Sequence, residues 1–261
     1  MKEAIATLWL VAVSACGGAA TPQAASPAIA ETATVPSPEA LAVVDAADRT
    51  DADRKLDGGR HPAQLLTFLG VRPGMRIAEL VAGAGYTAEL LARAVAPSGT
   101  VFAENPKFIL DRAEAGWSER LAKPANRNVV RVDRELDTPL PPEANNLDLV
   151  LVNLVYHDTV WLGVDRDKMN RAVFAALKKD GTYAVVDHSA RPGSGFADVQ
   201  TLHRVDEVAV RSEVERAGFV LRSAGQFLRN PSDHRDWNDS PIAAAERRGT
   251  SDRFALLFAK P

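Results

Sequence analysis

The stretch 75–93, MRIAELVAGAGYTAELLAR, constrains the fold of this chain more than any other. An apolar run of strand length at 75–81 is followed by four small residues, AGAG, and apolar residues then recur at helical spacing. Glycines adopt backbone torsions closed to other residues, and the next helix presents unpaired N–H groups and a positive dipole end. The sequence therefore predicts a strand, a tight turn and a helix, with a polar or anionic ligand over Gly83 and Gly85.

Two acids accompany this unit. Glu79 lies near the end of the predicted strand, and Glu104 follows the next apolar run, 100–103. A carboxylate in the second position can accept hydrogen bonds from both hydroxyls of a ribose. We therefore expect a cofactor that contains adenosine.

The arrangement resembles motif I of class I S-adenosylmethionine (SAM) dependent methyltransferases, in which an acid precedes the glycine loop as Glu79 does here. The resemblance implies that Glu79 and the loop hold the methionine end of SAM, and that Glu104 holds its ribose. Val81 departs from the family, which usually has its first glycine there. Residues 83–88 also satisfy the looser dinucleotide fingerprint G-x-G-x-x-G/A, with an acid about 20 residues further on, so an NAD-dependent enzyme is the alternative.

The resemblance also implies an acid that contacts the adenine amino group after the third strand, predicted at 128–132. Asp133 is the candidate there and Glu135 the alternative. The expected cofactor-binding residues are Glu79, Gly83, Gly85, Tyr86, Thr87, Glu104, Asp133 and Asn153.

The N-terminal residues are expected to form a targeting signal. Residues 4–13 are apolar but too few to span a bilayer as a stable helix, which is typical of a signal-peptide core. The following VSACG resembles a bacterial lipobox with Cys16 as the lipidated residue; a buried helix with an incidental cysteine is the alternative. Because Cys16 is the only cysteine of the chain, no internal disulfide forms. We expect a lipid-anchored protein in the bacterial cell envelope with its domain in the periplasm, or a cytoplasmic protein if 1–16 is no signal.

The composition of the chain changes near residue 40, which predicts a tether before that point and a folded domain after it. Residues 17–39 are rich in Ala, Pro, Thr and Ser, which predicts a disordered tether, and 40–261 are enough for one α/β domain. The net charge of −3 and pI near 6.0 argue against a nucleic-acid partner and leave a small-molecule substrate. The charged stretch 45–61 is either a lid over the site or a solvated helix surface. The sequence does not predict the oligomeric state.

Strands and helices alternate along the domain, which predicts an α/β fold: a Rossmann-like, doubly wound, seven-stranded sheet, mostly parallel with an antiparallel C-terminal hairpin. The hairpin favours methyltransferases over nicotinamide domains. More narrowly, the chain resembles a group of often exported bacterial predicted methyltransferases that share Tyr-His-Asp after strand four, Val-Asp-His-Ser-Ala after strand five and a closing Ser-Asp-Arg-Phe strand. Beyond those already named, the expected strands are 147–153, 182–186, 219–223 and 253–259, and the expected helices are 41–47, 62–69, 106–123, 166–179 and 196–217.

Histidines paired with acids mark the expected catalytic edge. His157 and Asp158 leave strand four, and Asp187 and His188 leave strand five, at the carboxyl ends of strands where open α/β sheets bind ligands. A neutral histidine can take a proton from an acceptor, and a neighbouring carboxylate orients the ring. We predict His157 or His188 as the base of methyl transfer to an oxygen or nitrogen, with Asp158 or Asp187 supporting it.

A metal site is a weaker hypothesis on the same edge. Its candidate ligands are His157, His188, His203 and Asp206, which suit a divalent transition metal. Because SAM is made in the cytoplasm, export leaves one more alternative, a non-catalytic periplasmic module that binds a ligand or a metal.

Overall fold

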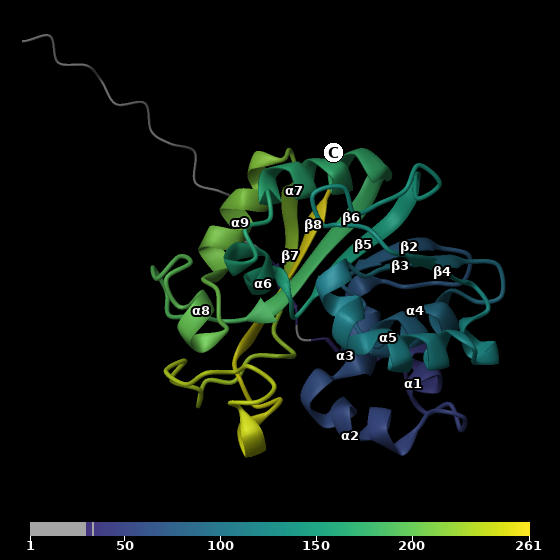
Figure 1. The fold of residues 1–261 in the computed structure, drawn as a ribbon, viewed down its shortest axis with the longest axis horizontal. Helices are drawn as coiled ribbons and strands as arrows, with labels where there is room; N and C mark the ends of the chain where they lie inside the picture. Colours follow the sequence, from purple (N-terminus) through teal and green to yellow (C-terminus); the bar gives the residue numbers. More distant parts are fainter. Residues whose placement is uncertain (1–29, 33) are drawn as a thin grey trace, which may run out of the picture.

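The computed structural model describes residues 30–32 and 34–261 (Figure 1). The predicted signal peptide with Cys16, and most of the predicted tether, lie outside the described residues. Where the structure begins, it differs from the predicted tether, because 30–32 form a strand and the first helix starts at Pro38. Across the described ranges, no helix combines the length and the apolar character needed to cross a membrane.

The described residues form one sheet with the strand order β1-β7-β8-β6-β5-β2-β3-β4. All pairs are parallel except those of β8, which runs antiparallel to both β6 and β7. This confirms the predicted doubly wound sheet with its antiparallel C-terminal hairpin; β1 adds an edge strand to the seven. The strands are β1 (Ala30–Thr32), β2 (Arg76–Leu80), β3 (Thr100–Glu104), β4 (Val129–Val132), β5 (Leu147–Asn153), β6 (Leu177–His188), β7 (Val220–Gly225) and β8 (Arg253–Ala259).

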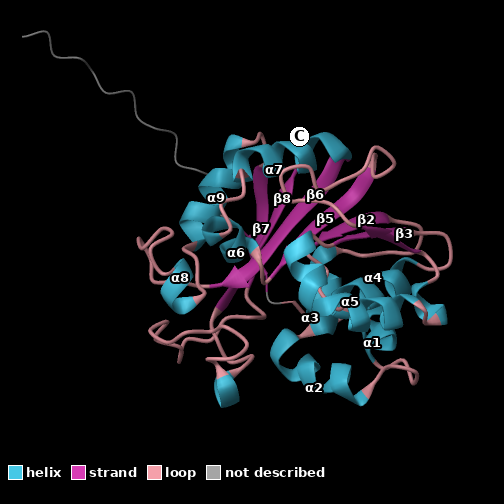
Figure 2. Cartoon of the chain, in the orientation of Figure 1, coloured by secondary structure: helices cyan, strands magenta, loops and turns pink. Residues whose placement is uncertain are grey.

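Helices cover both faces of the sheet (Figure 2). One face carries α1, α3, α4 and α5, and the other carries α6, α7, α8 and α9; each layer contributes side chains to its own apolar core. The helices are α1 (Pro38–Val44), α2 (Asp51–Arg60), α3 (Pro62–Leu69), α4 (Tyr86–Val95), α5 (Lys107–Leu121), α6 (Tyr156–Trp161), α7 (Arg166–Ala176), α8 (Val199–Leu202) and α9 (Glu207–Arg216), with short 3₁₀ turns η1 (Pro124–Asn126) and η2 (Ala245–Arg247).

The central strand β5 explains why the sheet needs both layers. Its sequence LDLVLVN is almost continuously apolar, and four consecutive residues, 149–152, are buried. Alternate side chains of a strand point to opposite faces, so such a run is stable only where both faces are covered. Leu149 and Leu151 accordingly join the α4 core, while Val150 and Val152 join the α7 core.

The helix predicted at 196–217 is wrong, because the chain breaks it into α8 and α9. His203 ends α8 in the left-handed conformation with φ of 51°, and Asp206 caps α9 by accepting a hydrogen bond from the N–H of Val208 at 3.0 Å. The same carboxylate accepts from the N–H groups of Gly193 and Gly195. A short acid that can cap a helix favours a helix start over a helix interior.

The charged stretch 45–61 contains α2, and its charges divide between solvent and protein: Asp51 and Lys55 are exposed, whereas others form ion pairs. Arg49 pairs with Asp57 at 2.7 Å, and Asp53 pairs with Arg120 of α5 at 2.8 Å. Asp57 also accepts a hydrogen bond from the hydroxyl of Tyr86, the first residue of α4. These contacts fasten α2 to the glycine turn.

Candidate functional site

The turn between β2 and α4 has three residues at positive φ: Val81 at 58°, Gly83 at 61° and Gly85 at 80°. A Cβ on Gly85 would lie 2.4 Å from the Trp117 ring, so only glycine fits under α5. A Cβ on Gly83 would meet open space, which leaves the backbone there accessible. A ligand can therefore approach the main chain at Gly83.

Asn105 holds Gly83 in place, and sequence reasoning missed it. Its Oδ1 accepts from the Gly83 N–H at 2.7 Å, and its Nδ2 donates to the Gly83 carbonyl at 3.0 Å. Asn105 is fully buried and follows Glu104 directly at the end of β3. A polar residue at the carboxyl end of a buried strand was the signal that could have identified it.

Both predicted acids are buried. Burial raises the pKa of Glu79 to about 8, against the smaller opposing effect of Thr87. Burial also raises the pKa of Glu104, although its Oε2 accepts a hydrogen bond from the Val81 N–H at 3.0 Å. Oε2 of Glu79 and Oε1 of Glu104 are buried without a hydrogen-bond partner among the described residues. Unpartnered buried oxygens are costly, and donors on a ligand would satisfy them.

The other predicted cofactor residues lie around this turn with protein partners. Asn153 Nδ2, at the end of β5, donates to Thr87 Oγ1 at 3.2 Å. Asp133 and Glu135 follow β4, and the charges of both add to the raised pKa of Glu104, so all three carboxylates lie near one another. Asp133 pairs with Arg131 at 2.9 Å, while Glu135 accepts from the Lys107 N–H at 3.3 Å. The geometry does not choose between them.

His157 lies at the start of α6 between two carboxylates. Its Nδ1 is 2.7 Å from Oδ1 of Asp187, and its Nε2 is 3.2 Å from Oδ1 of Asp158. Burial alone would lower the pKa of His157, but the charges and hydrogen bonds of the two acids outweigh it and raise the pKa to about 10. His157 is therefore an imidazolium at neutral pH and a poor acceptor of protons.

His188, at the end of β6, has a different environment. Its Nδ1 contacts the carboxylate of Asp239 and lies 2.9 Å from Oγ of Ser251. Burial lowers the pKa of His188, and the nearby Asp239 opposes that effect without reversing it. A neutral ring that donates from Nδ1 to a carboxylate keeps an unprotonated Nε2, as a general base requires. The carboxylate at the His188 ring is that of Asp239, which sequence reasoning missed, whereas Asp187 contacts the ring of His157.

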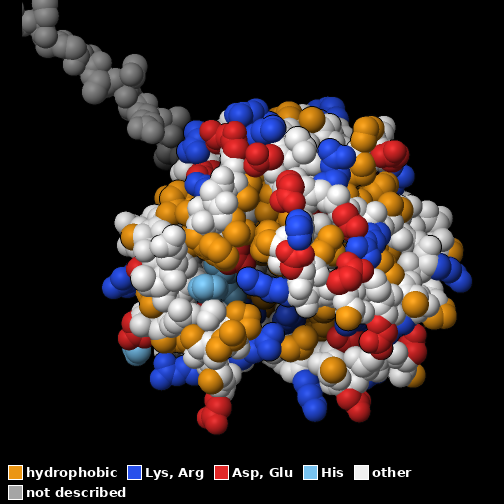
Figure 3. All heavy atoms as spheres, viewed as in Figure 1, with side chains coloured by type: hydrophobic (Ala, Val, Ile, Leu, Met, Phe, Trp, Pro, Cys, Tyr) orange, Lys and Arg blue, Asp and Glu red, His pale blue; other side chains and the backbone are white. Residues whose placement is uncertain are grey.

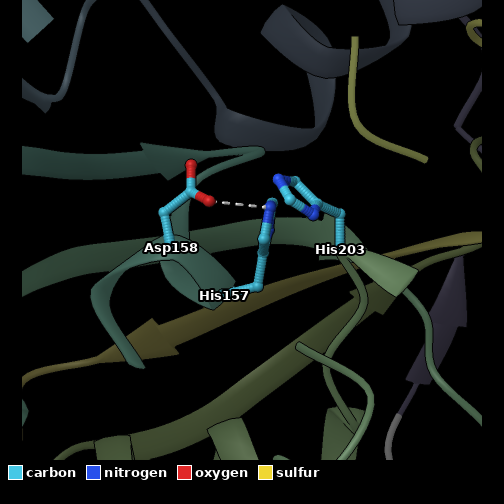
Figure 4. A group of neighbouring side chains, drawn as sticks. All are labelled: His157, Asp158 and His203. Carbon is cyan, nitrogen blue, oxygen red and sulfur yellow. Dashed lines mark ion pairs between the residues drawn. The ribbon is translucent and has the colours of Figure 1, made fainter. Parts of the chain in front are cut away.

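His203 completes the histidine cluster, with its ring centroid 5.3 Å from that of His157 (Figure 4). Burial lowers its pKa, and its Nδ1 is buried without a hydrogen-bond partner in the described part of the chain. His157, Asp158 and His203 offer three ligand atoms within 4.8 Å of one another, a set that could hold a metal ion. A metal would have to displace the contact between His157 and Asp158. Asp206 does not belong to this set, because backbone N–H groups occupy its carboxylate.

The three histidines line one cavity of about 560 Å³. Figure 3 shows histidine side chains in a hollow of this face, with Lys and Arg side chains beside them. The cavity is bounded by α2 and α5, by the ends of β5 and β6, and by the C-terminal loop; its lining includes Lys55, Arg60, Phe108, Arg112, Leu154, His157, Asp158, Trp161, His188, His203, Asp239, Arg248 and Arg253. Its size suits a small organic molecule.

Solved structures of other proteins resemble the fold of this chain. No family model and no curated protein matches the chain. A SAM-dependent methyltransferase from Aquifex aeolicus matches with a TM-score of 0.55 and 18% identity, over 82% of this chain and 100% of the other. TrmN from Thermus thermophilus matches at 0.50 and 17%, over 76% and 47%. The glycopeptide N-methyltransferase MtfA, complexed with sinefungin, matches at 0.52 and 15%, over 83% and 90%.

The chain therefore has the fold of SAM-dependent methyltransferases. In this fold the residues around the turn fit the expected cofactor in two respects. Unpartnered oxygens of Glu79 and Glu104 suit a ligand with ammonium and hydroxyl donors, and the backbone at Gly83 is open. Glu104 is, however, fully buried in the structure, and one of its oxygens already bonds the turn. Ribose binding at Glu104 therefore requires local opening of this edge.

Proposed function

We propose that this protein is a SAM-dependent methyltransferase that acts on a small molecule held in the histidine-lined cavity. The observation that carries the proposal is the pair of unpartnered carboxylate oxygens at Glu79 and Glu104, at the carboxyl ends of adjacent parallel strands in a methyltransferase fold. Ligands of open α/β sheets bind at this edge. The fold alone would leave the activity open, because one fold hosts many functions.

Each residue near the turn has a distinct part in holding the cofactor. Glu79 binds the amino group of the methionine portion, Glu104 binds the ribose, and Asn105 keeps the Gly83 backbone in position for close approach. Asp133 or Glu135 contacts the adenine. When bound, SAM supplies an electrophilic methyl group. The positive charge of the SAM amino group also suits Glu79, because a neighbouring cation would lower the raised pKa of Glu79 and favour its ionised carboxylate.

We infer that His188 is the base. The acceptor is a hydroxyl or an amine, and His188 Nε2 takes the proton that it loses, while Asp239 orients the ring from Nδ1. His157 acts differently: Asp187 and Asp158 contact its two ring nitrogens and hold the ring in place at the wall of the cavity, and their carboxylates offset its positive charge.

Calorimetry with SAM, S-adenosylhomocysteine and NADH tests the cofactor assignment. We expect micromolar affinity for the first two and none for NADH. Glu79→Gln should weaken SAM binding at least tenfold, whereas Glu119→Gln, at an exposed position on α5, should leave it unchanged. NADH binding without SAM binding would favour the dehydrogenase alternative.

A screen of phenols, quinol-like rings and amines with labelled methyl donor tests the reaction. His188→Ala should reduce turnover at least a hundredfold while SAM affinity stays within a few-fold. A loss of both together would assign His188 to the fold. Equal turnover of His188→Ala and the parent protein would reject it as the base.

A non-catalytic binding module on the same fold is the second candidate. Two observations favour it, namely Val81 in place of a glycine and the bond from its N–H to Glu104, which closes the ribose position. Export to the periplasm, where SAM is not made, would agree with it. Absence of SAM binding together with binding of another small molecule in the cavity would establish this candidate.

A further inference from the structure

The buried arginines of this chain reveal an imbalance of charge. Arg49 and Arg204 have side chains only 2% and 0% exposed, and each pairs with an aspartate, Asp57 at 2.7 Å and Asp233 at 2.8 Å. This pairing is the expected arrangement, because a guanidinium taken out of water without a counter-charge carries a large desolvation penalty.

Arg253, which is buried, and Arg60, which is half-buried, break this pattern. Within the described ranges, neither has a carboxylate within ion-pair distance. Arg253 is 3% exposed and donates only to the backbone carbonyls of Ser251 and Gly249, at 3.3 and 3.0 Å. Arg60 stacks over the Tyr86 ring with its Cζ 4.5 Å from the centroid. Burial lowers the pKa of both side chains, that of Arg253 to about 10.

The two arginines belong to the same cavity. Each lines it, and Gly59, the neighbour of Arg60, packs against Gly249, whose carbonyl accepts a hydrogen bond from Arg253 at 3.0 Å. The two acids that line the cavity form their direct contacts elsewhere, Asp158 with His157 and Asp239 with His188, and the lining holds five Lys and Arg side chains against these two acids. The cavity thus has an excess of positive charge.

The surrounding backbone keeps the two arginines together. Arg60 ends α2 and Arg253 begins β8, and the loop that leads into β8 packs on α2. A Cβ on Gly59 would lie 2.9 Å from the Gly249 Cα, so the two chains touch main chain to main chain. Backbone packing between α2 and the loop before β8 therefore holds both arginines at the wall of the cavity.

We propose that Arg60 and Arg253 form an anion subsite, and that the acceptor molecule carries a carboxylate or phosphate group that binds between them. The identity of the ligand as the acceptor rests on the proposed function. The anion would anchor one end of the acceptor on α2 and β8, with the nucleophile toward His188 across the cavity. Guanidinium groups are suited to both anions, because their N–H donors match two oxygens at once.

Binding to the full chain tests the subsite with three probes of similar shape: benzoate, phenyl phosphate and the neutral benzamide. We expect at least one anion to bind at least tenfold more tightly than benzamide. Arg60→Met and Arg253→Met should each remove that preference. Arg72→Gln, an exposed arginine at the opposite edge of the sheet, is the matched control and should retain it. Which anion binds more tightly distinguishes a carboxylate from a phosphate acceptor.

Thermal denaturation shows whether a variant that loses anion binding is still folded. Arg60→Met should raise the melting temperature without ligand, because it removes a charge that has no ion-pair partner, whereas Arg204→Met should lower it by removing the counter-charge of the buried Asp233. Equal binding of benzamide and both anions, binding unaffected by the two substitutions, or no binding of any probe would overturn the subsite. So would a tenfold loss of SAM affinity with benzoate binding unchanged, since the arginines would then serve the cofactor. Anion binding to a protein that fails to bind SAM would support the subsite and reject the proposed methyl transfer.

Discussion

Asp187 contacts His157 twice: its Oδ1 lies 2.7 Å from the ring Nδ1, and its Oδ2 accepts from the backbone N–H of His157 at 2.7 Å. This fully buried carboxylate at the end of β6 therefore fixes both the ring and the first turn of α6. Asp187→Asn keeps the shape but removes the charge. We expect the pKa of His157 to fall from about 10 toward neutrality, as measured by NMR titration of the imidazole. An unchanged pKa would show that Asp158 alone sustains it.

The same pair predicts a pH dependence of stability. Because the folded pKa of His157 is raised, its contribution is fully present below the pKa of an unfolded histidine, about 6.5, and is lost as pH rises through about 10. Urea denaturation should show the free energy of unfolding of the parent protein falling across this window. His157→Gln should lower that free energy by about 2 kcal/mol at pH 6 and flatten the slope. A slope that is unchanged in the variant would assign the dependence to other groups.

Glu79 should show a conflict between stability and binding. Its folded pKa of about 8 lies above that of an ordinary glutamate, so the protein becomes less stable as pH rises from about 4.5 to 8 and Glu79 must ionise in a buried place. Glu79→Gln removes this cost. We expect the variant to be more stable than the parent at pH 9, by on the order of 2 kcal/mol, and no more stable at pH 4. Denaturation at the two pH values, beside the SAM titration, measures both effects; lower stability at pH 9 would contradict the assigned burial.

The sequence predicted the sheet because the signals for it are local. The apolar run 147–153 coincides with β5, and the run 253–259 coincides with β8. The glycine turn follows from conformational need at Gly83 and Gly85, both at positive φ. Patterns of this kind can be read from the sequence, because the spacing of apolar residues and the backbone freedom of glycine each depend on only a few neighbouring residues.

The site was predicted less completely because its pairings are long-range. His188 pairs with Asp239, more than 50 residues later, and Arg60 of α2 lines the same cavity as Arg253 of β8. No local pattern indicates which acid reaches which histidine. The expected helix at 196–217 failed for a different, local reason: the cap formed by Asp206 competes with an apolar pattern that suited a continuous helix.

Asn105 should control the turn from the side of β3. Asn105→Ala removes both hydrogen bonds to the half-buried Gly83, and each lost hydrogen bond costs about 0.5–1.5 kcal/mol. We expect weaker SAM binding, by at least fivefold, together with a lower melting temperature. Asn145→Ala is the control and should change neither, because the exposed Asn145 amide bonds only to its near neighbours in the chain, Pro142 and Asn146. Unaltered SAM affinity in Asn105→Ala would show that Gly83 does not need this clamp.

The expected lipid anchor is testable without a structure. If Cys16 is lipidated in a bacterial host, the full chain should partition into the membrane fraction, and mass spectrometry should find a diacylglycerol adduct on the mature N-terminus. Cys16→Ser should abolish the adduct and release the protein. A soluble parent protein that retains Met1 would instead favour the cytoplasmic alternative and remove the difficulty of supplying SAM outside the cell.

Val81 places a β-branched residue at φ of 58°, where the side chain crowds the backbone. The valine side chain also packs against the core, so truncation loses contacts in any variant. Val81→Ala loses the side-chain contacts and keeps the backbone strain. Val81→Gly loses the same contacts but also relieves the strain. We therefore expect Val81→Gly to be more stable than Val81→Ala by about 1 kcal/mol, the reverse of the usual order. The same pair of substitutions at Val129, half-buried in β4, should follow the usual order, with alanine the more stable; chemical denaturation of all four variants decides whether strain at Val81 is real.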